Sequence, residues 1–155
     1  MALINVTLPD GNVNEYATGI TCAEVITDAL GRKHGCLAAR IDGVECDLSR
    51  VLDADCSIVG ILSDSDEGLH VLRHSAAHLL AQAVMALYPD AKPTIGPAVD
   101  RGFYYDFAME QIVESDLKAI QKKMQELARK NFTVERVELT DEELQDIVLK
   151  KQLEY

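Results

Sequence analysis

The stretch LHVLRHSAAHLLAQAVMALY, residues 69–88, carries the pattern on which the predicted fold depends. Its apolar residues recur at three- and four-residue intervals, which predicts an amphipathic helix with one face in a core. The predicted core face comprises Leu69, Leu72, Ala76, Leu79, Leu80, Ala83 and Leu87. At about 100° per residue, three histidines fall on the opposite side. These are His70, His74 and His78. We expect a central helix that packs on its leucine face and forms the floor of a cleft with its histidine face.

The overall composition indicates an acidic globular protein. The 155-residue chain has 15 basic and 26 acidic residues, a formal net charge of −11, and 48% apolar residues. That apolar content suffices for one medium core or two small ones. The acidic balance argues against a nucleic-acid site that depends on total charge, although a local basic patch could be concealed within it.

The sequence contains no signal for a membrane or for secretion. No apolar run reaches the roughly 20 residues that span a bilayer. The start, MALINVTLPDG, lacks the basic and apolar regions of a signal peptide. We therefore expect a soluble, cytoplasmic protein with no membrane partner.

Four cysteines lie in the first third of the chain, at spacings that match neither zinc nor redox motifs. They are Cys22, Cys36, Cys46 and Cys56. In a cytoplasmic protein this favours small buried side chains or unreactive surface thiols over a disulfide or metal framework.

The first sixty residues alternate strand and helix signals. Two β-favouring stretches, 2–8 and 12–18, flank the turn Pro9-Asp10-Gly11, which predicts a hairpin. Thr21 and Glu24 form a capping box for a short helix that stops near Gly31. Further strand signals occupy residues 36–41, 44–46 and 57–62. This order predicts a β-grasp, or ubiquitin-like, α+β fold over residues 1–62, with ferredoxin-like and other small α+β folds as alternatives.

One basic group in this first domain could contact phosphate. Arg32, Lys33 and His34 follow the predicted helix, and Arg40 lies a few residues further on. An ordinary exposed loop is the interpretation that we favour.

Residues 63–68 are polar and acidic and predict a linker, so residues 63–155 form a second, partial α+β domain around the long helix. Its later part predicts an aromatic strand over 103–107, a helix capped by Ser115, and a half-buried strand over 132–139. A second capping box, Thr140 with Glu143, opens a helix over 141–155. The sequence stops inside that helix, which we interpret as a cut within a longer protein.

His74 and His78 are the leading candidates for chemistry. An i, i+4 spacing places both imidazoles on one helix face, within reach of a shared water or metal. No glutamate follows His74, so the pattern is not that of an HExxH metalloprotease. No histidine or cysteine follows His78, so a zinc site here would be incomplete. A purely structural role in a core remains the alternative.

The stretch RHSAAHLLAQAVMALYPDAKPTIGPAVDRGFYYDF, residues 73–107, resembles the opening of the editing domain of bacterial-type threonyl-tRNA synthetases. The β-grasp segment before it resembles the TGS domain with which those enzymes begin. The resemblance implies an enzyme family that attaches threonine to its tRNA with ATP and hydrolyses mischarged Ser-tRNA. By motif match it implies that His74 and His78 are catalytic in editing. It also implies that Tyr105 and Gly96 line the substrate pocket.

The resemblance further implies that much of the parent enzyme lies outside this sequence. The family's second pair of editing residues, its ATP and magnesium site, its zinc site and its homodimer contacts all lie in regions absent here. We therefore expect no cofactor or metal in this chain and little activity from it alone. Two other hypotheses remain open. One is a non-catalytic RNA- or protein-binding module with a structural histidine helix, and the other is a metal-dependent hydrolase of the alanyl-editing type.

Overall fold

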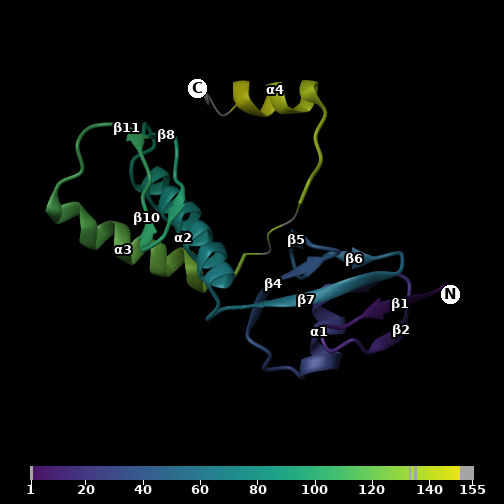
Figure 1. Ribbon diagram of the computed structural model, residues 1–155. Coiled ribbons are helices and arrows are strands. Elements are labelled where there is room, and N and C mark those ends of the chain that lie inside the picture. Colours follow the sequence, from purple (N-terminus) through teal and green to yellow (C-terminus); the bar gives the residue numbers. More distant parts are fainter. Residues whose placement is uncertain (1, 133, 135, 151–155) are drawn as a thin grey trace. The chain divides into compact units, whose positions relative to one another are not determined.

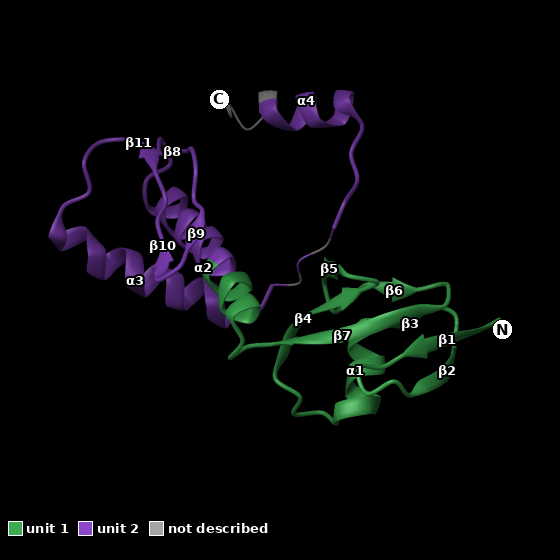
Figure 2. Cartoon of the chain, viewed as in Figure 1, with its two compact units in different colours: residues 1–73 green, residues 74–155 purple. Residues whose placement is uncertain are grey.

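The computed structural model describes residues 2–132, 134 and 136–150. The chain divides into two compact units, residues 1–73 and 74–155 (Figure 2). The boundary falls inside the long helix α2 (Asp66–Leu87), so the first turns of this helix belong to the first unit. No helix in the described part of the chain is both long enough and apolar enough to cross a bilayer.

The first unit is a five-stranded mixed sheet with α1 (Cys22–Leu30) packed against one face (Figure 1). The strand order is β2-β1-β7-β4-β5, and the central pair, β1 and β7, is parallel. The strands are β1 (Leu3–Thr7), β2 (Val13–Ala17), β4 (Cys36–Ile41), β5 (Val44–Cys46) and β7 (Cys56–Leu62). A small antiparallel pair, β3 (Ile20–Thr21) and β6 (Val51–Leu52), accompanies them. This confirms the predicted α+β, β-grasp fold.

Local signals account for these elements. Ile4 and Val6 are buried while their neighbours in β1 are exposed, which is the alternation of a strand with one face in a core. At the start of α1, the Glu24 amide donates to Thr21 Oγ1 at 3.3 Å, and the Thr21 amide donates to Glu24 Oε2 at 2.8 Å. The predicted capping box is therefore present. The helix ends at Gly31, whose φ of 81° a glycine adopts without strain.

The core of this unit lies between the sheet and α1. Its buried residues are Ile4, Val6, Cys22, Val25, Ile26, Cys36, Ala39, Leu52 and Ile58. All four cysteines are free thiols, and Cys22 and Cys36 are buried. The expectation that the cysteines act as small apolar side chains is confirmed for these two.

The second unit packs α2 against α3 (Glu114–Arg129) and a long, interrupted hairpin. The hairpin consists of β8 (Lys92–Pro93), β9 (Ala98–Val99), β10 (Gly102–Phe103) and β11 (Phe107–Ala108). β8 pairs with β11, and β9 pairs with β10. A last helix, α4 (Asp141–Lys150), follows. The buried core comprises Ala83, Val84, Ala91 and Ile120.

The predicted leucine face of α2 is partly wrong. Leu72 is 50% exposed and Leu87 is 37% exposed. Ala83 is buried as predicted, but the other buried apolar positions of α2 are Ala77, Ala81 and Val84, which the predicted face does not include. Small side chains allow other elements to approach a helix closely, so the alanines occupy the contact.

Three other predictions need correction. The strand expected over 103–107 is split, because residues 104–106 separate β10 from β11. Ser115 lies inside α3 and does not cap it, since the amide of Val113 donates to the Asp116 carboxylate at 3.0 Å. No strand forms at residues 132, 134 and 136–139, while 133 and 135 lie outside the described residues. The helix predicted over 141–155 is described as far as residue 150.

Candidate functional site

The candidate histidines lie on α2, and the start of this helix is fixed by the side chain of Ser65. Ser65 Oγ donates to the carbonyl of Leu62 at 2.7 Å and accepts from the Gly68 amide at 3.0 Å. Ser65 therefore satisfies one of the amides that every helix N-terminus leaves without an internal partner. Asp66 and Glu67 occupy the first turn, where the helix dipole favours negative charge.

The same helix start is held to the sheet by an ion pair and a close contact. Arg40 Nη2 lies 2.7 Å from Glu67 Oε1 and 3.3 Å from Glu45 Oε1. Hydrogen bonding and charge attraction from Glu67, followed by Glu45, raise the pKa of the Arg40 guanidinium. Gly68 lies so close to the Leu62 carbonyl that a Cβ would overlap it. Arg40 is thus engaged by two carboxylates, which leaves the phosphate interpretation of Arg32, Lys33 and His34 without its fourth member.

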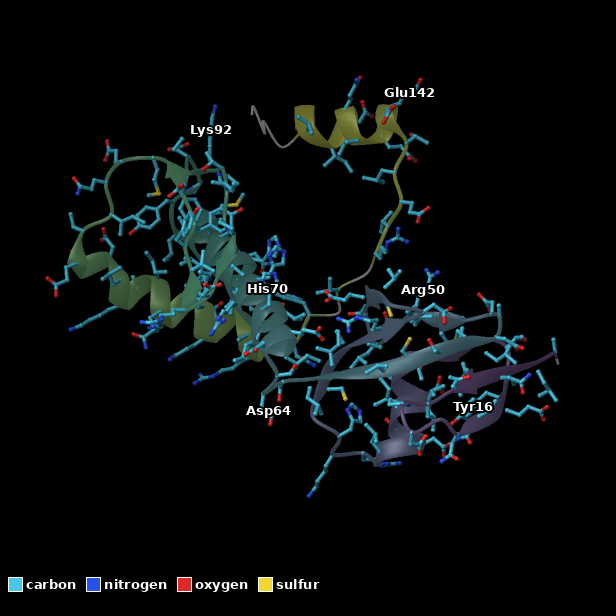
Figure 3. The ribbon with its side chains drawn as sticks, viewed as in Figure 1. Tyr16, Arg50, Asp64, His70, Lys92 and Glu142 are labelled. Carbon is cyan, nitrogen blue, oxygen red and sulfur yellow. The ribbon has the colours of Figure 1, made fainter. Side chains whose placement is uncertain are left out.

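His74 and His78 lie one turn apart on α2, in the part of this helix that belongs to the second unit. Their Nε2 atoms are 3.0 Å apart, and their rings meet edge to face with centroids 4.6 Å apart. Both side chains are exposed. Figure 3 labels His70, an exposed residue one turn before His74 on the same helix.

This distance fixes how the two rings can share protons. At 3.0 Å one Nε2 donates its hydrogen to the lone pair of the other Nε2. In the neutral pair the donor ring then has a lone pair at Nδ1, and the acceptor ring has a hydrogen there. The pair therefore combines one hydrogen-bond acceptor with one donor, an arrangement suited to orienting a water beside a polar substrate.

Gly96 and Tyr105 lie against each other in the hairpin. Between the β8–β11 and β9–β10 pairs, residues 94–97 face only residues 104–106, so one strand carries an extra residue, a β-bulge. The ring of Tyr105 covers Gly96 so closely that a Cβ there would overlap it. The Tyr105 ring also stacks on the Phe107 ring, with the two ring centroids 4.8 Å apart. The bulge and the glycine together set the position of the tyrosine ring.

Three hydrogen bonds to and from Asp106 hold this hairpin next to the β8–β11 pair. The Thr94 amide donates to the Asp106 carbonyl at 3.0 Å, and the Asp106 amide donates to the Ile95 carbonyl at 2.8 Å. Thr94 Oγ1 donates to the same Asp106 carbonyl at 2.9 Å. The backbone is therefore paired at Ile95 and Asp106, the residues next to Gly96 and Tyr105.

The structure thus forms two local pairs from the four predicted site residues, His74 with His78 and Gly96 with Tyr105. The hollows that we find are lined by other residues: one lies along α1, from Ala23 to Arg32, and one along α3, from Lys122 to Lys130. No group of three histidine, cysteine, aspartate or glutamate side chains suited to a metal ion occurs in the described part of the chain.

One contact in the second unit, between Tyr88 and Asp116, has no signal in the sequence pattern. Burial raises the pKa of the Tyr88 hydroxyl, and the charge of Asp116 and a hydrogen bond to it raise it further. This contact joins the residue after α2 to the first turn of α3. The sequence pattern marks Tyr88 only as the end of the helix, because nothing in local spacing pairs it with a residue 28 positions away.

Comparison with known proteins adds a family context. Residues 4–61 match the TGS domain family, as expected from the sequence. Over 143 residues the chain is 46% identical to a protein of Acidithiobacillus ferrooxidans named threonine–tRNA ligase. The alignment covers 90% of this chain and 22% of that protein. A Legionella pneumophila protein of the same name is 44% identical over 137 residues, covering 87% of this chain and 22% of that protein. A Burkholderia multivorans protein of the same name is 45% identical over 136 residues. This alignment covers 86% of this chain and 21% of that protein. The chain therefore spans about a fifth of the length of these relatives.

Proposed function

We propose that this chain is the N-terminal part of a threonine–tRNA ligase, with a TGS domain over residues 1–62 and the first portion of an editing domain over residues 63–155. Identity of 44–46% along most of the chain supports the assignment. The parent protein would attach threonine to its tRNA with ATP in translation, in the cytoplasm. The regions of the relatives that this chain does not cover would hold the ATP, magnesium and zinc sites and the homodimer contacts.

A ligase for threonine needs a second site for a physical reason. Serine lacks one methyl group of threonine, and a missing methylene is worth only about 1–3 kcal/mol of selectivity. A site that accepts serine and hydrolyses Ser-tRNA can remove the products of that weak discrimination. We assign part of this site to His74, His78, Gly96 and Tyr105.

The observation that carries the proposal is the 3.0 Å contact between the Nε2 atoms of two exposed histidines. In hydrolysis, a water oxygen bonds to the ester carbonyl carbon, the bond to the terminal ribose oxygen breaks, and a water proton moves to that oxygen. The His74–His78 pair would orient the water with its acceptor and the substrate with its donor. Tyr105, positioned over Gly96, would form one side of the pocket.

This site is incomplete within the chain, because the resemblance assigns a further cysteine–histidine pair to sequence beyond residue 155. We therefore expect the 155-residue chain to deacylate Ser-tRNA far more slowly than the full-length parent. Turnover by the chain equal to that of the parent would refute this part of the proposal.

The test of the histidine pair uses the full-length parent with His74→Ala or His78→Ala. We expect hydrolysis of Ser-tRNA to fall about 10²- to 10⁴-fold, with charging of threonine retained. His70→Ala is the matched control, since it removes another exposed imidazole from the same helix and should leave hydrolysis unchanged. If hydrolysis survives in both variants, the editing assignment fails and the non-catalytic binding module becomes the better reading.

A further inference from the structure

Positive charge is concentrated in the part of α3 that follows the acidic first turn (Glu114 and Asp116) and in the two residues after the helix. Residues 117–131 contain five of the chain's 15 lysines and arginines and a single carboxylate, Glu126. This segment therefore has a net charge of +4, whereas the whole chain has −11. The five cations are Lys118, Lys122, Lys123, Arg129 and Lys130.

Two of these cations are already engaged with neighbours. Glu126 Oε1 lies 3.2 Å from Lys123 Nζ and 3.4 Å from Lys130 Nζ. Lys130 Nζ also lies over the ring of Phe132, 5.8 Å from its centroid. The single carboxylate of the segment is therefore used by this pair of lysines.

The other three cations share the outer face of the helix. An α-helix turns by about 100° per residue, so Lys118, Lys122 and Arg129 lie within about 40° of one another around the helix axis. The opposite face packs into the core through Ile120, Met124 and Leu127. Lys118, Lys122 and Arg129 are exposed and form no ion pair with any residue that the structure describes. We call these three residues the α3 cation row.

Helix stability accounts for only one member of the α3 cation row, Arg129, which lies in the last turn of α3, where the helix dipole favours a cation. Lys118 and Lys122 are like charges at i, i+4, a spacing that destabilises an isolated helix. A shallow hollow lies among side chains at the end of the row, lined by Lys122, Gln125, Glu126, Arg129 and Lys130. At 1.5 Å per residue the row extends over about 16 Å. That length is enough to meet several phosphates along a nucleic-acid strand.

We propose that the α3 cation row contacts the phosphate backbone of tRNA. The proposal rests on the proposed function for its choice of polyanion, and on charge complementarity for its choice of surface. An acidic chain repels RNA over most of its surface, so a local row of exposed cations directs the approach of the RNA to this helix. Each phosphate contact releases counterions, which makes the interaction sequence-independent and sensitive to salt.

The test measures binding of a fluorescently labelled threonine tRNA transcript to the full 155-residue chain between 50 and 200 mM salt. The variant is Lys122→Ala/Arg129→Ala. The matched control, Lys33→Ala/Arg50→Ala, removes the same charge from exposed residues of the β-grasp unit. We expect the α3 variant to bind tRNA about tenfold more weakly at 100 mM salt. The slope of log binding constant against log salt concentration should become shallower by about two, and the control should keep the affinity and slope of the unmodified chain.

Several outcomes would overturn the proposal. One is equal weakening by both variants, which would indicate total charge or the β-grasp unit as the cause. Another is the absence of binding to the unmodified chain at 50 mM salt. Retention by anionic vesicles or by polyglutamate as strong as by tRNA would show a general anion surface instead. Hydrolysis of Ser-tRNA by the parent is measured separately, so loss of the RNA contact and failure of the editing assignment give different results.

Discussion

Gly96 and Tyr105 show how one position can depend on another that is nine residues away. The β-bulge brings the tyrosine ring onto the glycine, where a side chain would overlap it. His74 and His78 differ in this respect, because their contact follows from helical spacing alone. One pair therefore depends on the tertiary arrangement of a hairpin, and the other depends only on the formation of α2.

Gly96→Ala should destabilise the second unit. The added methyl group must displace the Tyr105 ring or the bulge, and such overpacking costs about 1–3 kcal/mol. Urea unfolding followed by tyrosine near-UV circular dichroism measures the change. Gly102→Ala is the control in the same hairpin, because a Cβ at Gly102 meets nothing within 4 Å. Equal stability of the Gly96 and Gly102 variants would contradict the contact.

Cys22 should be the least reactive thiol in the folded chain. Burial, followed by the neighbouring Cys46 thiol at 3.9 Å, raises the pKa of Cys22 to about 12. At pH 8 this lowers the thiolate fraction about a thousandfold relative to an ordinary thiol, and the thiolate is the form that reacts. Iodoacetamide labelling followed by mass spectrometry should modify Cys22 only after unfolding in urea. Rapid labelling of Cys22 in the folded chain would disagree with this burial.

At the scale of secondary-structure elements, the long helix is joined to the β-grasp sheet by a contact that only a glycine permits. Gly68 lies against the Leu62 carbonyl and directly follows Glu67, which forms the ion pair with Arg40. Gly→Ala inside a helix ordinarily stabilises by about 1 kcal/mol. Gly68→Ala should do the opposite and destabilise the first unit, since the methyl group meets backbone that cannot move away. A rise in the urea midpoint for this variant would contradict the close approach.

The pairing of β1 with β7 should depend on pH through Asp55. The Asn5 amide donates to Asp55 Oδ1 at 2.8 Å, and this bond, with a second from the Asn5 side chain, lowers the pKa of the carboxyl. A lowered folded-state pKa stabilises the fold above the unfolded pKa of about 3.9, and this contribution is lost as the pH falls through the folded value. Asp55→Asn should therefore reduce the decline in unfolding free energy between pH 5 and pH 2. Asp53→Asn, at an exposed neighbour, is the control for removing one surface carboxylate, and an equal effect of both substitutions would contradict the role of the Asn5 contact.

The elements that the sequence predicted correctly are those set by local chemistry. Thr21 with Glu24 and Thr140 with Glu143 both form capping boxes, with amide-to-carboxylate distances of 2.8 Å. The errors occurred where distant partners decide the outcome. Leu72 and Leu87 fit a helical core stripe, yet the approach of α3 and the hairpin buries alanines instead. The alternating stretch 132–139 has strand propensity, but a strand also needs a neighbour with which to exchange hydrogen bonds.

The candidate site follows the same division. Helical spacing predicted the proximity of His74 and His78, and the structure gives it as 3.0 Å between Nε2 atoms. Spacing could not have placed Tyr105 on Gly96, because the one-residue bulge changes the pairing register between them. That pair was identified through the family resemblance. The α3 cation row was concealed by the net charge of −11, since total charge carries no information on where cations gather.

At the scale of the whole molecule, the residues that the structure describes form two separate hydrophobic cores, and this should be visible in unfolding. The β-grasp core includes Ile58, which is 2% exposed, and the second core includes Ile120, which is 5% exposed. Truncating a buried isoleucine to alanine costs about 2–5 kcal/mol through lost burial and the cavity left behind. Ile58→Ala should destabilise residues 2–62, and Ile120→Ala should destabilise residues 74–129.

Hydrogen exchange measured by mass spectrometry distinguishes the two regions within one molecule. Each substitution should accelerate exchange mainly in the unit that contains it, because each core is built from residues of its own unit. The smaller second core, with fewer buried residues, should open at lower denaturant concentration than the β-grasp unit. If both substitutions accelerated exchange equally across the whole chain, the two units would form one cooperative body. In that case a change in the TGS domain would alter the stability of the histidine pair directly, and the two domains of the proposed ligase fragment would not fold independently.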